Sequence, residues 1–267
     1  MLRDEYLRKK RRKRLVRYGA VFLIFVLLIA LASYIAHRPS VRISQVELSG
    51  GILVTQDDLA PKALSFVQGS YVWLFPKNNV LWYPHKALEK YLRETFQRID
   101  TIDIHLKDFH TLAIDITERK PVAMWCDDAD EEQCYFMDQN STIFSPAPIF
   151  SGDAYFKYYG LLASTSPIGR EYIASSTVFS DIFNFIAETK TLGLRPQYLV
   201  AKDEGQFSLV VSGGGEIYFD VKEPLSVALQ NLEALLRTSA FATTTDGDLP
   251  IQYIDLRYGN KLFYKLR

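Results

Sequence analysis

The chain has 267 residues, of which 48% are hydrophobic, enough for one or two modest folded domains beyond any membrane anchor. Lys and Arg number 31, as do Asp and Glu, so the net charge is zero. Nine Lys and Arg residues, opposed only by Asp4 and Glu5, lie within the first 17 positions, and the remainder therefore carries about −7. This acidic balance argues against nucleic acid as a partner of the larger part of the chain.

An uncharged apolar stretch follows the basic segment. No charged side chain occurs from Tyr18 to Ala36, and about 19 residues at ~1.5 Å each make about 28 Å of helix, close to the ~30 Å hydrocarbon core of a bilayer. We therefore predict a basic cytoplasmic tail at 1–17 and a transmembrane helix at 18–37. The Lys and Arg excess places the N-terminus in the cytoplasm and the remainder outside, in a single-pass type II orientation in the cell (inner) membrane.

Two alternatives remain open for this region. Ala30-Leu31-Ala32 resembles the cleavage site of a signal peptide, which would be removed from the mature chain. The basic cluster also fits a nucleic-acid patch. The long basic segment and the bilayer-wide apolar run favour a retained anchor, beside which the cluster contacts anionic lipids.

Residues 41–119 predict a small α+β module with the order strand, helix, helix, strand, strand. Its strands alternate apolar and polar residues and are expected at Ile43–Leu48, Ile102–Leu106 and Leu112–Ile116. Thr55 fits the N-cap of the first helix, which we expect to end at Gly69. Pro84 fits the first position of the second helix.

Between these helices lies the apolar run Val72-Trp73-Leu74-Phe75. We expect it to pack onto the core of the module as a connector. The two last strands are expected to be joined by a turn at Asp108-Phe109-His110.

Residues 120–267 predict a larger mixed β/α domain. Further strands are expected at 157–159, 198–202, 207–211, 216–221, 251–258 and 261–266. One helix is expected from about Ser176, with Phe179, Ile182, Phe183 and Ile186 on its apolar side, and another from Pro224. Gly259-Asn260 predicts a two-residue turn that joins the last two strands in an antiparallel hairpin.

The only two cysteines, Cys126 and Cys134, flank a short acidic segment. Facing strands of a hairpin would bring them together, and an extracytoplasmic compartment permits a disulfide. Its loop of about nine residues would contribute roughly 2–3 kcal/mol; two free thiols are the alternative. The acidic segment 127–132 lacks the spaced ligands of a calcium loop, so we expect a solvated hairpin tip.

No motif predicts catalysis, a cofactor or a metal site. The histidines, His37, His85, His105 and His110, show no zinc-ligand spacing, and the last two are expected at the surface. The run 212–215 predicts a flexible turn, because a phosphate loop needs a Lys-Ser/Thr pair and a following helix. We therefore expect a protein that is not an enzyme.

The order of these parts resembles the FtsQ/DivIB family of bacterial cell-division proteins. The resemblance is carried by Ile43–Gly50, by Leu112–Trp125 with its Glu118-Arg119-Lys-Pro121, by Phe136-Met-Asp138-Gln-Asn140 and, most sharply, by Tyr253-Ile254-Asp255-Leu256-Arg257-Tyr258. It covers most of the chain and identifies 41–119 as similar to a POTRA module and 120–267 as similar to the family's β domain. The cysteine pair and the segment Phe150–Arg170 depart from the family pattern.

This resemblance implies a non-catalytic scaffold of the divisome, at the division septum, that links division proteins and helps control septal cell-wall synthesis. The implied partners are small bitopic proteins of the FtsB/DivIC and FtsL types and the septal wall-synthesis enzymes. The alternatives from other classes are a membrane-anchored cell-wall enzyme and a secretion or signalling protein with a POTRA-like module.

The last predicted strand offers a physical means of binding. As the outer strand of a sheet, Lys261–Leu266 would present unpaired backbone groups to an incoming strand. Arg257 and Tyr258 match the family's partner-contacting region. We predict that the partner-binding residues are Arg257, Tyr258, Lys261, Leu262, Phe263 and Tyr264. The alternative is that Asp255 and Arg257 form only a surface ion pair, worth ~0–1 kcal/mol.

Overall fold

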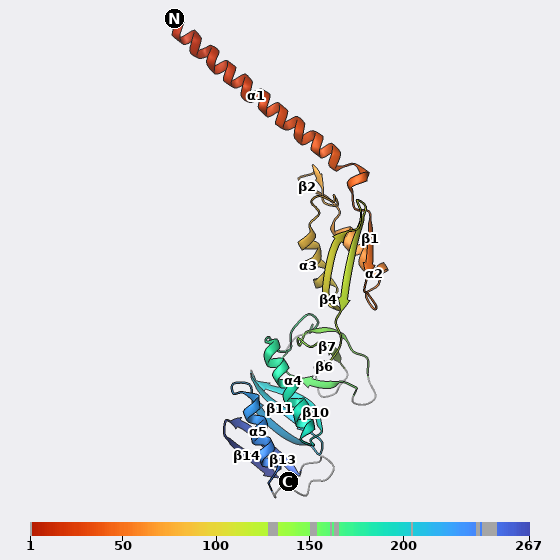
Figure 1. Ribbon diagram of the computed structural model, residues 1–267, viewed down its shortest axis with the longest axis vertical. Coiled ribbons are helices and arrows are strands. Elements are labelled where there is room, and N and C mark those ends of the chain that lie inside the picture. The colour runs from red at the N-terminus through yellow and green to blue at the C-terminus, as the bar shows by residue number, and fades with distance from the viewer. Residues whose placement is uncertain are drawn as a thin grey trace. The chain divides into compact units, whose positions relative to one another are not determined.

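The computed structural model describes residues 2–127, 133–149, 154–160, 162, 166–203, 205–238, 241 and 250–267 (Figure 1). Most of the acidic hairpin tip and parts of the segment 150–170 lie outside this description. The chain divides into two compact units between Glu118 and Arg119, one residue from the predicted boundary. Each unit is mixed α and β, and each is described by itself.

The first unit begins with one continuous helix, α1 (Leu2–Ala36), which contains both the basic segment and the apolar stretch. The stretch from Arg11 to Ala36 is long and apolar enough to cross a membrane. Its apolar side chains are exposed almost throughout, as expected of a helix whose surroundings are lipid rather than protein. The helix begins well before the predicted span 18–37 and ends one residue earlier.

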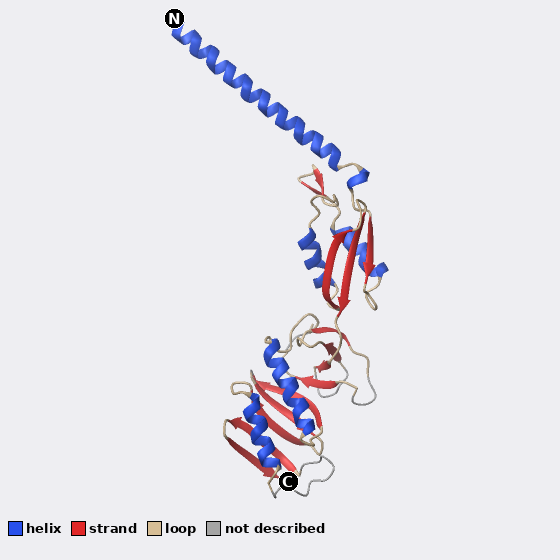
Figure 2. Cartoon of the chain, viewed as in Figure 1, coloured by secondary structure: helices blue, strands red, loops and turns tan. Residues whose placement is uncertain are grey.

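A three-stranded sheet forms the centre of the rest of this unit. Its order is β1 (Gln45–Ser49), β5 (Thr111–Glu118), β4 (Ile99–Leu106), with β1 parallel and β4 antiparallel to β5. The helices α2 (Gln56–Phe66) and α3 (His85–Thr95) pack against β1 and β4 (Figure 2). The predicted order of three strands and two helices is confirmed.

The helix boundaries follow local chemistry. Thr55 caps α2, because its hydroxyl accepts a hydrogen bond of 3.2 Å from the backbone N–H of Asp58. Pro84 is the N-cap of α3 rather than its first residue. Helix α2 ends at Phe66, three residues before Gly69, which adopts a positive φ of 94°.

Glu118, at the end of β5, holds the loop between β1 and α2. Its Oε1 accepts hydrogen bonds from the backbone N–H groups of Ile52, Leu53 and Val54 at 2.7, 2.7 and 2.9 Å. Burial by itself would raise the pKa of Glu118, but these three donors outweigh it and the pKa lies below its usual value. The loop approaches β5 so closely that a Cβ on Gly50 would lie 2.1 Å from the carbonyl oxygen of Ile116.

The predicted packing of the run 72–75 onto the core is wrong. These residues form the end of a small two-stranded hairpin, β2 (Ser70–Tyr71) and β3 (Phe75–Pro76). Val72 is 78% exposed and Trp73 82% exposed. A short apolar run without periodicity fits both a buried connector and an exposed loop. Only tertiary contacts separate the two, and the sequence pattern does not show them.

The second unit contains a nine-stranded mixed sheet. In spatial order the strands are β14 (Lys261–Leu266), β13 (Ile251–Tyr258), β12 (Gly215–Asp220), β11 (Gln206–Val211), β10 (Pro196–Asp203), β9 (Phe156–Tyr159), β6 (Ala123–Cys126), β7 (Cys134–Met137) and β8 (Ile143–Pro146). Strand β9 is parallel to both β10 and β6, and β12 is parallel to β13. The other neighbours are antiparallel.

Helices α4 (Ser176–Thr191) and α5 (Leu225–Leu236) lie across one face of the part of the sheet formed by β10–β14 (Figure 2). The predicted apolar side of α4 is partly wrong: Phe183 is 42% exposed, whereas Phe185 is buried with its ring centroid 4.6 Å from that of Phe219. The buried face of α4 therefore continues through Ile182, Phe185 and Thr189.

Two contacts organise the beginning of this unit. Cys126 and Cys134 lie opposite each other on β6 and β7 and are joined by a disulfide, with their Cα atoms 4.2 Å apart. Asp138 forms an ion pair with Arg119 and accepts backbone hydrogen bonds from Asn140 and Thr142 at 2.8 and 2.9 Å. Asp138 thus fixes the turn that follows β7, and its ion pair with Arg119 attaches the start of the unit to this turn. Both residues belong to the segments that carry the family resemblance.

Candidate functional site

Strand β14 is the outermost strand at one end of the large sheet, as predicted. It pairs in antiparallel fashion with β13, through registers that include Ile254 with Tyr264 and Asp255 with Phe263. Within the described residues no strand lies on its outer side. Alternate backbone N–H and C=O groups of such a strand point away from its neighbour and are available to an added strand.

The side chains of β14 alternate between the two faces of the sheet. Leu262 packs against the core, and the ring of Tyr264 lies edge-on to that of Phe241 with centroids 5.7 Å apart. Tyr264 remains partly exposed, as does Leu266. This face is the one covered by α5, because Tyr264 is the register partner of the fully buried Ile254.

Phe263 lies on the opposite face with Lys261 and Lys265. Its ring is 52% exposed and contacts the ring of Tyr258, with centroids 5.3 Å apart. Large aromatic side chains that are exposed and held in a fixed arrangement are typical of the residues that dominate binding at protein interfaces. The neighbouring lysines oppose unspecific pairing of the edge with other strands.

Arg257 is bound within its own domain. Its guanidinium donates to both carboxylate oxygens of Asp255, at 2.8 and 2.6 Å, and to Oε1 of Gln206 at 2.9 Å, and it lies 5.4 Å from the centre of the Tyr218 ring. Asp255 is only 7% exposed, so this pair differs from the solvated ion pair of the alternative interpretation.

Asp255 and Arg257 each shift the pKa of the other. Burial by itself raises the pKa of Asp255, but the hydrogen bonds and charge of Arg257 outweigh it, so the pKa lies below its usual value. The hydrogen bond to Asp255 raises the pKa of Arg257. Arg257 therefore links β13 to Gln206 at the start of β11 and keeps part of its own surface in solvent.

The turn between β13 and β14 is held by a hydrogen bond from helix α5. The side-chain amide of Asn231 on α5 donates a hydrogen bond of 2.6 Å to the carbonyl oxygen of Gly259. Gly259 has a positive φ of 61°, as a two-residue hairpin turn requires. The edge strand therefore leaves a turn that is anchored to α5.

The structure brings the six predicted binding residues together on β13 and β14. Tyr258, Lys261, Phe263 and Tyr264 are exposed, whereas Leu262 and Arg257 are partly covered. Gln206, Tyr218, Asn231 and Phe241 support them and were missed. Each lies more than 20 positions in the chain from the residue that it contacts, and periodicity within one strand or helix does not identify such neighbours.

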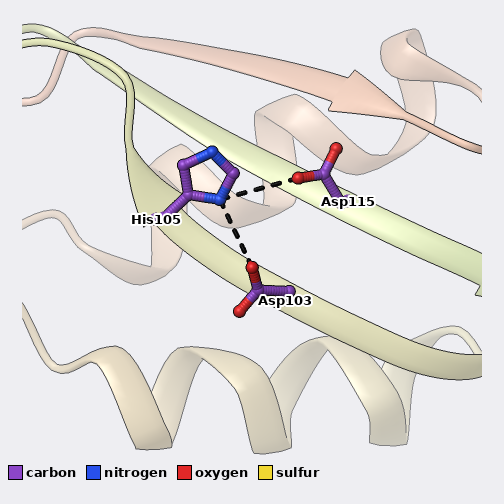
Figure 3. A group of neighbouring side chains, drawn as sticks. All are labelled: Asp103, His105 and Asp115. Atoms are coloured by element: carbon purple, nitrogen blue, oxygen red, sulfur yellow. Dashed lines mark ion pairs between the residues drawn. The ribbon is translucent and has the colours of Figure 1, made fainter.

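Apart from the edge strand, one group of His and Asp side chains in the described part of the chain is close enough together to hold a cation. His105 Nδ1 is 3.4 Å from Asp103 Oδ2 and 3.5 Å from Asp115 Oδ2, on neighbouring strands β4 and β5 (Figure 3). All three residues are exposed, as predicted for His105. Water competes for exposed carboxylates, so we assign this group as a cluster of solvated polar side chains at the surface.

Comparison with models of known protein families gives no match to this chain, and comparison with curated proteins gives none either. The resemblance to the FtsQ/DivIB family therefore rests on the residue patterns of the sequence alone.

Proposed function

We propose that this protein is a non-catalytic, single-pass scaffold of the bacterial division machinery, similar to FtsQ/DivIB. In this proposal α1 anchors it in the cell membrane with the basic N-terminal segment in the cytoplasm. Both folded units lie outside and act at the division septum, where they link division proteins and help control septal wall synthesis. It needs no cofactor.

The observation that carries the proposal is the edge strand β14. Among the described strands it is the last at its end of a large sheet, and it presents Phe263 with Tyr258 as a pair of exposed aromatic rings. Backbone pairing with an incoming segment supplies affinity, and the side chains on the two faces supply selectivity. The proposed partners are small bitopic proteins of the FtsB/DivIC and FtsL types, followed by the septal wall-synthesis enzymes.

The architecture of the first unit supports the same family. Its central sheet and helices follow the order strand, helix, helix, strand, strand, with the short β2–β3 hairpin between the helices and with β1 parallel to β5 beside the hairpin of β4 and β5. We assign it as a POTRA-like module. Glu118 and Arg119, which belong to the resemblance, lie on either side of the division between the two units and hold the adjoining loop and turn.

Depletion in dividing cells tests the proposal. A fluorescent fusion that restores growth is expected at mid-cell, and depletion is expected to give long cells without septa. A uniform distribution of the functional fusion around the membrane, with normal septa after depletion, would reject the division role. It would favour the alternative classes, a cell-wall enzyme or a secretion or signalling protein.

A further inference from the structure

The hairpin of β2 and β3 ends in an apolar tip that the proposed function does not use. Val72 and Trp73 are exposed for about four fifths of their surface, and Leu74 is also exposed. Leu81, a few residues further on, is exposed to a similar extent. Apolar side chains gathered at one place on a surface mark a site of contact with lipid or protein.

The backbone of this tip is unusual for its residues. Val72 and Trp73 have positive φ values of 45° and 57°, and the N–H of Leu74 donates to the carbonyl of Tyr71 at 3.1 Å. Turns with two positive φ angles favour Asn and Gly, and a branched residue such as Val is disfavoured there. Two large apolar residues therefore occupy positions where turn stability alone favours small polar ones.

The hairpin is attached to the end of the apolar helix. The hydroxyl of Ser33 in α1 donates a hydrogen bond of 2.7 Å to the carbonyl oxygen of Leu74. Figure 1 shows β2 beside the end of this helix. Asn79 is fully buried and its side chain donates to the carbonyl of Ala36 at 3.1 Å. The tip therefore lies within about one helical turn of the end of α1.

This position corresponds to the polar interface of a bilayer that α1 spans. The interface adds about 5–7 Å on each side of the hydrocarbon core, so one turn of helix stays within it. Indole and phenol rings favour this region because they combine an apolar body with a polar group. Trp73 and Tyr71 bring such rings to it from the hairpin.

Cations accompany these rings. Nζ of Lys77 lies 5.6 Å from the centre of the Tyr71 ring, and the guanidinium of Arg38 lies 4.6 Å from the centre of the Tyr34 ring. Lys and Arg at the end of a transmembrane helix favour lipid phosphates. The surroundings of the tip thus combine apolar, aromatic and basic groups in the manner of a membrane interface.

We propose that the β2–β3 tip, Val72-Trp73-Leu74, inserts into the outer interface of the membrane that α1 spans. It provides a second lipid contact, which holds the first folded unit against the bilayer. This inference rests on the proposed membrane anchoring by α1. The ligand class is phospholipid, reached through apolar insertion rather than through a headgroup pocket.

Fluorescence quenching tests this with the full chain in phosphatidylcholine–phosphatidylglycerol vesicles. Lipids carrying a quencher near the headgroup are expected to quench part of the emission, and the variant W73F is expected to lose that quenched part. The matched control is the double variant W73F/I52W. Ile52 is 84% exposed in the same unit and lies beside Glu118, at the end of β5 opposite His110. His110 is on the side of α1, because its ring Nδ1 lies 3.3 Å from the carbonyl oxygen of Arg42, six residues after the end of that helix. Its tryptophan is expected to escape quenching.

The outcomes separate the two proposals. A full chain that does not float with the vesicles contradicts the membrane anchor and this inference together. A chain that floats, but in which W73F is quenched as strongly as the natural sequence, overturns the insertion of the tip alone. Equal quenching of the tryptophans at 73 and 52 also overturns it, because it shows general adsorption rather than a specific contact.

Discussion

The ring of Tyr258 stands at 89° to the ring of Phe263, with the two centroids 5.3 Å apart, although both side chains are exposed. Tyr258 ends β13 and Phe263 lies in β14, across the turn at Gly259-Asn260. The pair is thus formed by the hairpin itself. It supplies a fixed apolar surface at the end of the sheet, where no other described strand pairs with β14.

Replacement of Phe263 by Asp is expected to weaken binding of the FtsB/DivIC-type partner by at least about tenfold. The reason is that interface aromatic residues commonly contribute about 2 kcal/mol or more. The fold should persist, since Phe263 lies outside the core. The measurement is a pull-down or titration with purified partner. F183D is the control, because Phe183 is a similarly exposed Phe on α4. Equal binding by F263D and F183D would refute the assignment of the edge.

The pair Asp255–Arg257 is expected to contribute more stability than an exposed ion pair. Asp255 is buried and receives two hydrogen bonds from the guanidinium, so removal of Arg257 leaves a buried charge without its partner. A double-mutant cycle with D255A and R257A should give a coupling free energy of about 1–3 kcal/mol. The exposed pair Lys90–Glu94 should give less than about 0.5 kcal/mol. Similar values for the two pairs would show that the first is only a surface contact.

Glu118 is expected to make the first unit sensitive to acid. Its pKa in the folded state is lowered, so its ionised form adds stability above the unfolded pKa of about 4.3, and this stability is lost as the pH falls through the folded value. The free energy of unfolding should therefore begin to fall as the pH drops below about 5 and should continue to fall below the unfolded pKa. In E118Q this fall should be smaller, while stability at pH 7 should drop by about 1 kcal/mol, because the neutral amide oxygen still accepts the three bonds but more weakly than a carboxylate does. Chemical denaturation at each pH measures both; parallel pH curves would contradict the role of the three amides.

Tyr158 and Tyr172 should respond differently to loss of their hydroxyl groups. The hydroxyl of Tyr158 is buried and has no hydrogen-bond partner in the described residues, whereas that of Tyr172 donates to the carbonyl of Tyr159 at 3.0 Å. Y158F is therefore expected to be neutral or stabilising, and Y172F to cost about 1 kcal/mol. Thermal unfolding of the two variants tests this. A larger loss in Y158F would show that its hydroxyl has a partner such as a bound water.

The sequence predicts the elements well where periodicity and capping act within one segment. Thr55 marks the start of α2, and Gly259-Asn260 marks the last hairpin, because both effects depend on adjacent residues. The failures concern partners distant in the chain. Trp73 was expected in the core and Phe183 on the buried side of α4, since an apolar residue alone does not show which surface its element covers. The strand order that leaves β14 at the edge likewise depends on pairing across the whole unit.

Hydrogen exchange of the β14 amides, measured with and without saturating FtsB/DivIC-type partner, tests the central claim most directly. An added strand would pair with the outward-facing N–H groups of Lys261–Leu266. We predict that these amides exchange more slowly in the complex, while those of α4 keep their rates. Unchanged exchange along β14 in a saturated complex would contradict binding at this edge.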